Sequence, residues 1–218
     1  MTFFILDTYV QRINTWNSAD AEIKNIILDL YELEAIKLGN FTLKSGKPTP
    51  IYIDLRLVIS SPPLLKRIAH EIWKRVSPLS FDLICGVPYA ALPFATALSL
   101  ERDIPMLFCR KDIKEYGTKK RIEGHFKPGQ SCLIIEDVIT VGASILETVS
   151  SLQKAGLEIE DVVVIVDREQ GGKEKLKEEG LFLHSLISVF DLLKVLFKEK
   201  KISEEQFRNI NQYFTGSK

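Results

Sequence analysis

Glu136 and Asp137 stand at the end of an apolar run, just before a turn of small and hydroxyl residues that opens a helix. Backbone N–H groups at a helix start, joined by the hydroxyls of Thr140 and Ser144, can surround a monophosphate. Gly142 permits close approach of the backbone or a positive φ. The two acids would repel a phosphate, so they suit ribose hydroxyls, directly or through Mg²⁺, which prefers oxygen ligands. The segment therefore predicts a site for a phosphorylated sugar, although the spacing alone also fits a turn in which Asp137 merely caps the helix.

A second candidate for chemistry is the basic stretch 110–121, which carries a net local charge of +4. It has few large apolar residues and no helix or strand period, so we expect a long exposed loop, and such loops are commonly functional. Lysines on a closing loop could neutralise a departing pyrophosphate while excluding water. The alternative is a solvated charged loop, which is the usual fate of such runs.

Helical periodicity and turn residues predict the elements that position these groups. Apolar residues three and four apart predict a helix over 19–38, ending at Gly39. Residues 41–58 alternate around a turn at 44–50 rich in Gly and Pro, which predicts two short strands and a small hood. The remaining expected helices cover residues 62–76, 92–101, 143–154 and, as one or two closing helices, 189–214.

Four short apolar runs alternate with these helices, and such a pattern is typical of a parallel sheet that is covered on both faces. The expected strands are residues 82–87, 106–109, 132–135 and 162–166. Ligands of such sheets bind beyond the carboxyl ends of the strands. The sequence thus predicts an α/β fold, organised as one domain over 1–218 with a hood of about 1–60 and a core of about 61–218.

Composition excludes several function classes. Lys plus Arg and Asp plus Glu each total 29, so we expect neither nucleic acid nor a membrane as partner. The three cysteines lie in apolar stretches without metal-ligand spacing, and the three histidines show no metal-site spacing, so no residue is assigned as a metal ligand. These features, with no signal peptide or spanning run, predict a cytoplasmic protein with reduced thiols.

Six segments together carry a resemblance to a known family. The hydrophobic run, two acids and Thr-x-Gly-x-Ser turn of 133–144 resemble the signature of type I phosphoribosyltransferases. Further segments resemble the orotate phosphoribosyltransferases in particular, including the form found as the N-terminal domain of animal UMP synthase. These segments are residues 41–46, 50–56, 86–93, 110–119 and 167–173.

The resemblance implies a type I phosphoribosyltransferase fold and a glycosyltransferase of UMP biosynthesis, which joins orotate to the phosphoribosyl group of phosphoribosyl pyrophosphate. It implies Mg²⁺, bound mainly through phosphoribosyl pyrophosphate, and a homodimer with shared active sites. Lys114, Lys111 and Asp137 are the implied catalytic residues. The implied substrate-binding residues are Lys44, Tyr52, Ile53, Tyr89, Arg110, Tyr116, Glu136, Val138, Ile139, Thr140, Val141, Gly142, Ala143, Ser144 and Arg168. Arg168 suits the orotate carboxylate because its guanidinium can bind a carboxylate through two hydrogen bonds, the alternative being a surface pair with Asp167.

Two positions depart from the bacterial pattern and are shared with the animal-type enzymes. Tyr116 stands where many bacterial members have His, and Ala90 stands where they have a phosphate-binding Lys. More of the cationic role is therefore expected to fall on Lys111 and Lys114. Two other functions remain open: a non-catalytic sensor of phosphoribosyl pyrophosphate, and a phosphoribosyltransferase for a purine or another base.

Overall fold

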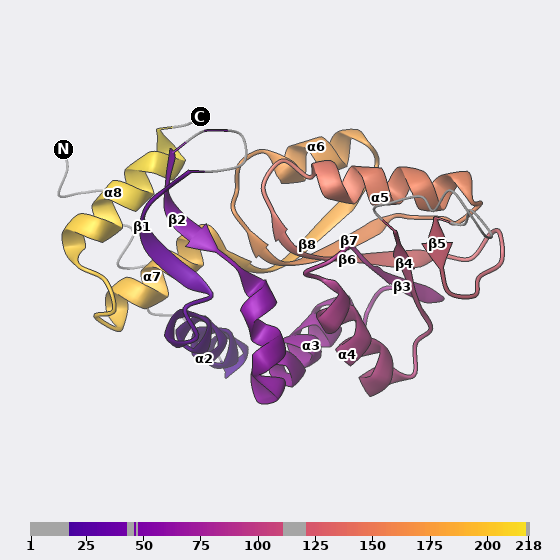
Figure 1. Cartoon of the computed structure of the whole chain (residues 1–218), viewed down its shortest axis with the longest axis horizontal. Coiled ribbons are helices and arrows are strands. Elements are labelled where there is room, and N and C mark those ends of the chain that lie inside the picture. The colour runs from indigo at the N-terminus through magenta and orange to yellow at the C-terminus, as the bar shows by residue number, and fades with distance from the viewer. Residues whose placement is uncertain (1–17, 43–45, 47, 111–120, 217–218) are drawn as a thin grey trace.

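The computed structural model describes residues 18–42, 46, 48–110 and 121–216. Its centre is a six-stranded sheet in the order β5-β4-β3-β6-β7-β8, shown in Figure 1. Neighbouring strands are parallel except for the short edge strand β5, which pairs antiparallel with β4. The strands are β3 (Leu83–Gly86), β4 (Met106–Cys109), β5 (Ile122–Glu123), β6 (Cys132–Ile139), β7 (Asp161–Asp167) and β8 (Phe182–Ser188).

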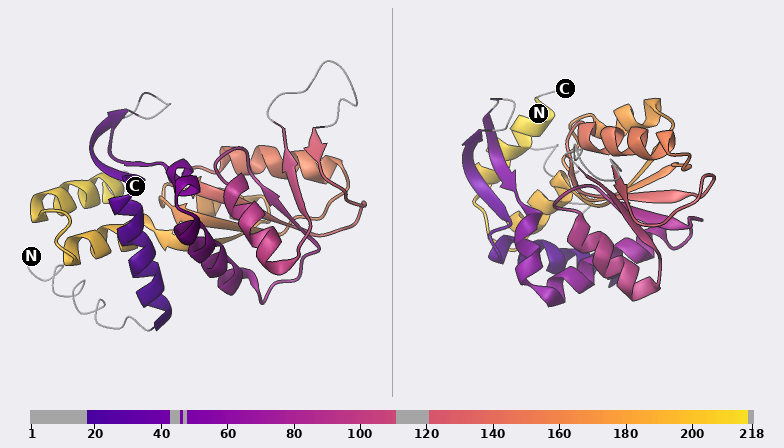
Figure 2. Two further views of the ribbon diagram at one scale, coloured as in Figure 1. Left: turned by 60° about the horizontal axis from the view of Figure 1, so that its bottom comes forward. Right: turned by 45° about the vertical axis from the view of Figure 1, so that its right-hand side comes forward.

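Helices cover both faces of this sheet, as Figure 2 shows in its right-hand view. One face packs against α5 (Ala143–Lys154) and α6 (Gly172–Glu178), and the other against α3 (Pro62–Val76) and α4 (Leu92–Arg102). Alternate residues of each strand point to opposite faces, so Val163 joins the α3 side while Val162 and Val164 join the α5 side. The continuous apolar runs in the sequence therefore reflect strands that are buried on both faces.

A small antiparallel hairpin, the hood, lies beside the core and is built from β1 (Ile36–Thr42) and β2 (Pro48–Ile53). The hood packs against α2 (Ser18–Glu32) and the last helix, α8 (Glu204–Thr215). Both of these helices also contact α7 (Val189–Lys198). The 3-10 helix η2 (Leu55–Ser60) connects the hood to α3. No helix within the described part of the chain is both long and apolar enough to span a membrane.

Most expected elements are present, but the first helix was predicted too long. It ends at Glu32 because Glu34 takes a positive φ of 57° and the chain turns there into β1. Ile36 keeps the three-residue spacing of the helix, yet it is buried in β1 opposite Ile53. The second hood strand ends at Ile53, so the expected alternation up to residue 58 is wrong and η2 takes its place.

The strand that leads to the acidic pair is longer than expected. β6 continues through Glu136 and Asp137 to Ile139, whereas the sequence placed its end at residue 135. β7 extends alongside it, with Asp167 paired to Ile139. The sequence prediction also lacked β8, β5 and α6. By contrast, the three cysteines of the apolar stretches are buried free thiols, which confirms the expectation for those side chains.

Candidate functional site

The expected site residues of segment 136–144, together with Arg168, lie at the carboxyl ends of β6 and β7. The backbone N–H of Arg168 donates to the carbonyl of Ile139 at 3.0 Å, which joins the two strand ends. The hood reaches the same place, because Arg168 Nη2 donates to Thr49 Oγ1 at 3.0 Å. Segments 119 residues apart in the sequence thereby form one site.

Glu136 is buried at 5% exposure inside the site. Ser144 Oγ donates to its Oε2 at 2.7 Å, and the Asp137 backbone N–H donates to its Oε1 at 3.0 Å. Burial, together with the neighbouring Asp137 carboxyl, raises the pKa of Glu136 to about 9 despite these bonds. Asp137 is only half-buried, so the two acids have different environments: Glu136 is enclosed and has a raised pKa, whereas Asp137 is accessible.

The turn between β6 and α5 has the geometry expected for an anion site. Gly142 is the N-cap of α5, with φ of 79°, and no side chain caps the helix. The alternative in which Asp137 caps this helix is therefore wrong. The first N–H groups of α5 have no acceptor within the helix, and Thr140 stands two residues before the N-cap. Behind the turn, α6 packs so closely that a Cβ at Gly172 would stand 2.7 Å from the Thr140 carbonyl oxygen.

Arg168 is buried at 4% exposure and has an uncompensated charge. Among the described side chains no carboxylate pairs with it, and its Nε–H has no hydrogen-bond partner there. Burial lowers the pKa of Arg168, and its guanidinium carbon lies 5.7 Å from the ring centroid of Phe214 in α8. The expected alternative, a surface pair with Asp167, is wrong, since Asp167 is also buried and accepts from the Glu169 backbone N–H at 2.7 Å.

On the hood, Tyr52 is 38% exposed and its ring lies 5.6 Å from that of Phe41. Arg56 donates to both carboxylate oxygens of Asp54 at 2.6 Å, and it reaches the Tyr52 hydroxyl at 3.4 Å. Asp54 chiefly, with smaller contributions from Tyr52 and Asp137, raises the pKa of Arg56. Ile53 is half-buried at the end of β2. Tyr52 of the hood and Arg56 of η2 thus place an aromatic ring next to a guanidinium that interacts electrostatically with Asp137.

The two ends of the basic stretch are fixed to the core. The backbone N–H of Arg110 donates to the carbonyl of Arg121 at 2.8 Å, and these side chains form ion pairs with Glu123 and with Glu147 of α5 respectively. Tyr89, after β3, is 61% exposed. The expected site residues Lys44, Lys111, Lys114 and Tyr116 lie outside the described residues, so their roles remain predictions.

Three further residues of this region received no role in the sequence analysis: Thr49, Arg56 and Phe214. The composition near them gave no signal for Thr49 or Phe214, because each contacts Arg168 only through the tertiary fold. Arg56 lies in a segment that carried the family resemblance, and that segment was the available signal.

Comparison with known proteins identifies relatives over most of this chain. A family model of the phosphoribosyl transferase domain matches residues 59–192. The uridine 5'-monophosphate synthase of Bos taurus is 46% identical over 198 residues, which cover 90% of this chain and 41% of that protein. The orotate phosphoribosyltransferase of Chlamydia caviae is 44% identical over 180 residues, which cover 82% of this chain and 87% of that protein. The chain therefore spans less than half of the bovine relative but most of the chlamydial one.

Solved structures share the fold. The UMP synthase of Leishmania donovani superposes with a TM-score of 0.85 at 34% identity, covering 94% of this chain and 45% of that one. The orotate phosphoribosyltransferase of Mycobacterium tuberculosis, solved in complex with 5-phospho-alpha-D-ribosyl 1-diphosphate, gives a TM-score of 0.67 at 28% identity, with coverage of 78% and 98%.

Proposed function

Because the chain belongs to the orotate phosphoribosyltransferase family, we propose that it transfers the phosphoribosyl group of phosphoribosyl pyrophosphate to orotate. The family is one of pentosyltransferases, and the fold is the type I phosphoribosyltransferase fold expected from the sequence. The products would be orotidine 5'-monophosphate and pyrophosphate, on the route to UMP. The observation that carries this proposal is the buried, uncompensated guanidinium of Arg168 beside the sugar-phosphate turn.

Arg168 fits orotate because a buried cation without a counter-ion favours an anionic ligand. Orotate is planar and carries a carboxylate, which a guanidinium can bind through two hydrogen bonds. Its Nη2 is held by Thr49 of the hood, while its Nε–H lacks a partner among the described residues. The ring of orotate would then lie between Thr140 and the hood residues Tyr52 and Ile53.

The turn at the start of α5 would bind the 5'-phosphate through the N–H groups and hydroxyls of residues 140–144. Val138 and Ile139 end the strand that presents this turn, and the 50% exposed Val141 lies at its outer side. Glu136 and Asp137 would bind the ribose diol. A protonated Glu136 can donate as well as accept a hydrogen bond, and it adds no negative charge near the phosphate.

In the reaction the C–O bond to pyrophosphate breaks and pyrophosphate leaves with the electron pair. The ring nitrogen of orotate forms the new C–N bond and gives up its proton, which leaves with pyrophosphate or passes to solvent. No covalent nucleophile is required, and the transition state resembles an oxocarbenium ion. Lys111 and Lys114 with Arg110 would stabilise the charge that grows on pyrophosphate. Lys44, Tyr89 and Tyr116 would complete the contacts to the substrates.

The described acids suit a Mg²⁺ ion that is bound mainly through the substrate. No group of three or more His, Cys, Asp or Glu side chains in the described ranges could hold a metal by itself, whereas Asp137 offers oxygen ligands to an ion that phosphoribosyl pyrophosphate brings. Mg²⁺ would neutralise part of the charge of the leaving pyrophosphate.

We propose further that residues 1–218 act as one cytoplasmic domain and as a homodimer whose sites are shared. Neither a nucleic acid nor a membrane is expected as partner, since the chain has no net charge to attract them. A non-catalytic sensor of phosphoribosyl pyrophosphate would need neither the basic stretch nor Arg168. Transfer to a purine is disfavoured because a purine has no carboxylate for that guanidinium.

The proposed function is tested by mixing the protein with orotate, Mg²⁺ and phosphoribosyl pyrophosphate and following the ultraviolet absorbance of orotate. We expect the absorbance to fall only when all three are present. Parallel reactions with uracil and with purines serve as specificity controls. Consumption of one of those bases instead of orotate would overturn the substrate assignment, and binding of phosphoribosyl pyrophosphate without turnover of any base would favour the sensor.

A further inference from the structure

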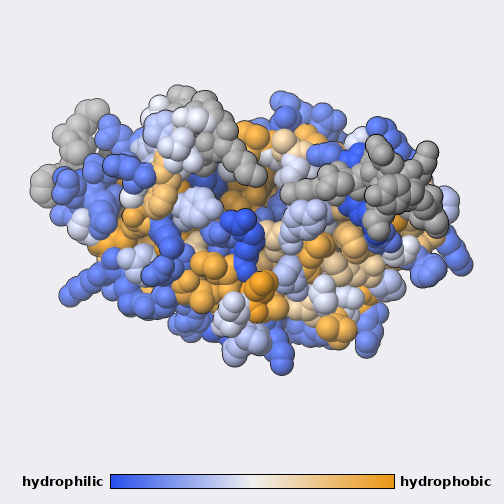
Figure 3. Space-filling model, viewed as in Figure 1, coloured by the Kyte–Doolittle hydropathy of each residue, from blue (hydrophilic) through white to orange (hydrophobic). Residues whose placement is uncertain are grey.

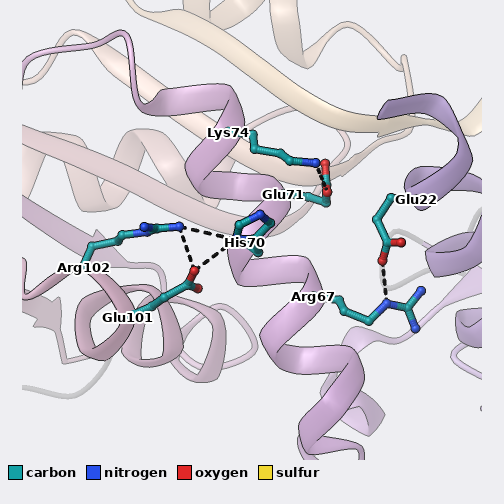
Figure 4. Close-up of polar contacts among 7 residues, drawn as sticks. All are labelled: Glu22, Arg67, His70, Glu71, Lys74, Glu101 and Arg102. Atoms are coloured by element: carbon teal, nitrogen blue, oxygen red, sulfur yellow. Dashed lines mark hydrogen bonds and ion pairs between the residues drawn. The ribbon is translucent and has the colours of Figure 1, made fainter. Parts of the chain in front are cut away.

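Arg168 is held by different groups from those that hold the cations of α3. Figure 4 shows two of the latter: Arg67 Nε contacts Glu22 of α2 at 2.5 Å, and Lys74 Nζ contacts Glu71 at 2.6 Å. Each has a carboxylate partner that neutralises its charge. Among the described side chains no carboxylate pairs with Arg168, and a hydroxyl and an aromatic ring contact it instead. Its position is therefore fixed while its charge is left for a ligand.

The hydroxyl of Thr49 fixes one end of the guanidinium. Thr49 Oγ1 accepts from Arg168 Nη2 at 3.0 Å and donates to the carbonyl of Ile51 at 3.0 Å. Because a hydroxyl has one proton and this one donates it to Ile51, the oxygen faces the guanidinium as an acceptor. Thr49 is 2% exposed and Arg168 is 4% exposed, so both hydrogen bonds are shielded from solvent.

The ring of Phe214 restrains the guanidinium from α8. The guanidinium carbon lies 5.7 Å from the ring centroid, a distance at which an aromatic ring attracts a cation. The ring of Phe214 also contacts two aromatic neighbours, Phe190 of α7 at 6.1 Å and Tyr213 at 5.0 Å between centroids. A neutral ring that is fixed in this way orients the cation without neutralising it.

These two contacts leave N–H groups of Arg168 for a ligand. Nη2 carries two N–H groups, of which Thr49 takes one, and Nε–H has no partner within the described residues. Nε and Nη2 lie on one edge of the planar guanidinium, and such an edge can bind both oxygens of a carboxylate. Where the hood meets the core, Figure 3 shows hydrophilic and apolar residues side by side, which suits a flat ring that carries a charged group.

We propose that Thr49 and Phe214 are positioning residues, which orient Arg168 so that this edge of its guanidinium meets the orotate carboxylate. The inference rests on the proposed function, since it names the residues that set the preference for orotate at the same site. Both residues act through Arg168 and not by contact with the substrate. Two segments from opposite ends of the chain, β2 and α8, thus determine together which base is accepted.

Steady-state kinetics of Thr49 variants test this role. Thr49→Val keeps the branched shape but removes the acceptor, so we expect the KM for orotate to rise roughly 10-fold, with little change in the KM for phosphoribosyl pyrophosphate. Thr49→Ser keeps the hydroxyl and should restore the KM for orotate to within about threefold of wild type. Thr42→Val is the matched control on the same hairpin, because Thr42 is exposed at the end of β1.

An independent pair of variants tests the ring on α8. Phe214→Leu should raise the KM for orotate roughly three- to fivefold, because the attraction of the cation to the ring is lost. Phe207→Leu is its control, since Phe207 lies on the same helix and stacks on Phe197, with 4.9 Å between centroids. Circular dichroism and the melting temperature check that every variant folds. If Thr49→Val does not fold, the Phe214 variant and its control carry the test.

A double-mutant cycle shows whether Thr49 acts through Arg168. In an Arg168→Lys chain, Thr49→Val should change the KM for orotate by less than about threefold, because an ammonium has no planar edge to orient. The positioning role is overturned if Thr49→Val raises both KM values alike, if Thr49→Ser does not restore the KM for orotate, or if the effects of the two changes multiply.

The same kinetics separate failure of this inference from failure of the proposed function. A wild-type protein that consumes orotate, with Thr49 and Phe214 variants whose KM values match those of their controls, would overturn the positioning role alone. A wild-type protein that neither binds nor consumes orotate would overturn the proposed function and the positioning role together.

Discussion

Arg168 combines the two properties that a specificity residue needs: a fixed position and an unsatisfied charge. Thr49 and the ring of Phe214 hold the guanidinium from the hood and from α8. Burial without an acid costs stability in the ligand-free protein, and an anionic substrate would recover that cost. The proposed orotate-binding group is therefore also the group that joins the hood to the core.

Two substitutions of Arg168 distinguish the contribution of its positive charge from that of its planar guanidinium group. For Arg168→Lys we expect the KM for orotate to rise roughly 10- to 100-fold, because an ammonium cannot bind the carboxylate in two places. The KM for phosphoribosyl pyrophosphate should change little. For Arg168→Met we expect lost activity together with a ligand-free protein that is unchanged or more stable by about 1 kcal/mol, since an unpaired buried charge is removed. Steady-state kinetics and thermal unfolding measure both effects; a destabilised protein with unchanged KM values would assign Arg168 a structural role only.

The protonated Glu136 carboxyl predicts a dependence of stability on pH. Between pH 4.5 and about 9 the unfolded chain releases a proton that folded Glu136 keeps, so the free energy of unfolding falls as pH rises. Glu136→Gln removes this slope, which is at most roughly 1.4 kcal/mol per pH unit. We expect the stability of the variant relative to wild type to increase from about pH 5 to about pH 8 in denaturant titrations without Mg²⁺. A constant difference between the two proteins would mean that Glu136 is ionised.

At the scale of elements, the start of α5 depends on the backbone of Gly142. Its φ of 79° is unfavourable for any residue with a Cβ, so Gly142→Ala should lose about 1 kcal/mol of stability. It should also weaken phosphoribosyl pyrophosphate binding, because the N–H groups of the turn would move. Gly129→Ala is the matched control: φ is 84° there, with open space around the position, and Gly129 precedes β6, whose opposite end carries the site. Isothermal titration calorimetry should find weaker binding of phosphoribosyl pyrophosphate only for the Gly142 variant. Equal weakening in both variants would mean that the turn is not part of the binding site.

Sequence periodicity predicted elements well where one pattern applied and poorly where two patterns overlapped. The helix at 62–76 has a single strong apolar stripe and was predicted to the residue. Ile36 lies three residues after Leu33, a spacing that fits a helix. It also fits a strand, and pairing with β2 places it in β1. β8 escaped prediction because His184 and Ser185 interrupt its apolar run, although His184 Nε2 pairs with Asp161 at 2.7 Å.

The site divides in a similar way. The sugar-phosphate turn is contiguous in sequence, so its acids, hydroxyls and glycine could be identified together. The pairing of Arg168 with Thr49 could not, because it spans 119 residues and depends on how the hood lies over the core. Burial of Arg168 likewise follows from α8, which brings Phe214 over the guanidinium. Local chemistry was predictable, while the environment that sets the charge state of each group was not.

At the scale of the whole molecule, the proposed substrate site is divided between the core and the basic stretch, which begins after β4 and ends before β5. If Lys114 acts in the site of a second copy, mixing Lys114→Ala chains with Arg168→Met chains should restore activity. Half of the dimers in an equal mixture are mixed, and each mixed dimer has one intact site, so about a quarter of wild-type activity is expected for a two-fold dimer. Mixing Arg168→Met with Glu136→Ala is the control, because both changes affect the same core and every site remains defective. Activity measured after subunit exchange decides the question: no rescue in the first mixture, with exchange demonstrated by a labelled chain, would mean that each chain completes its own site.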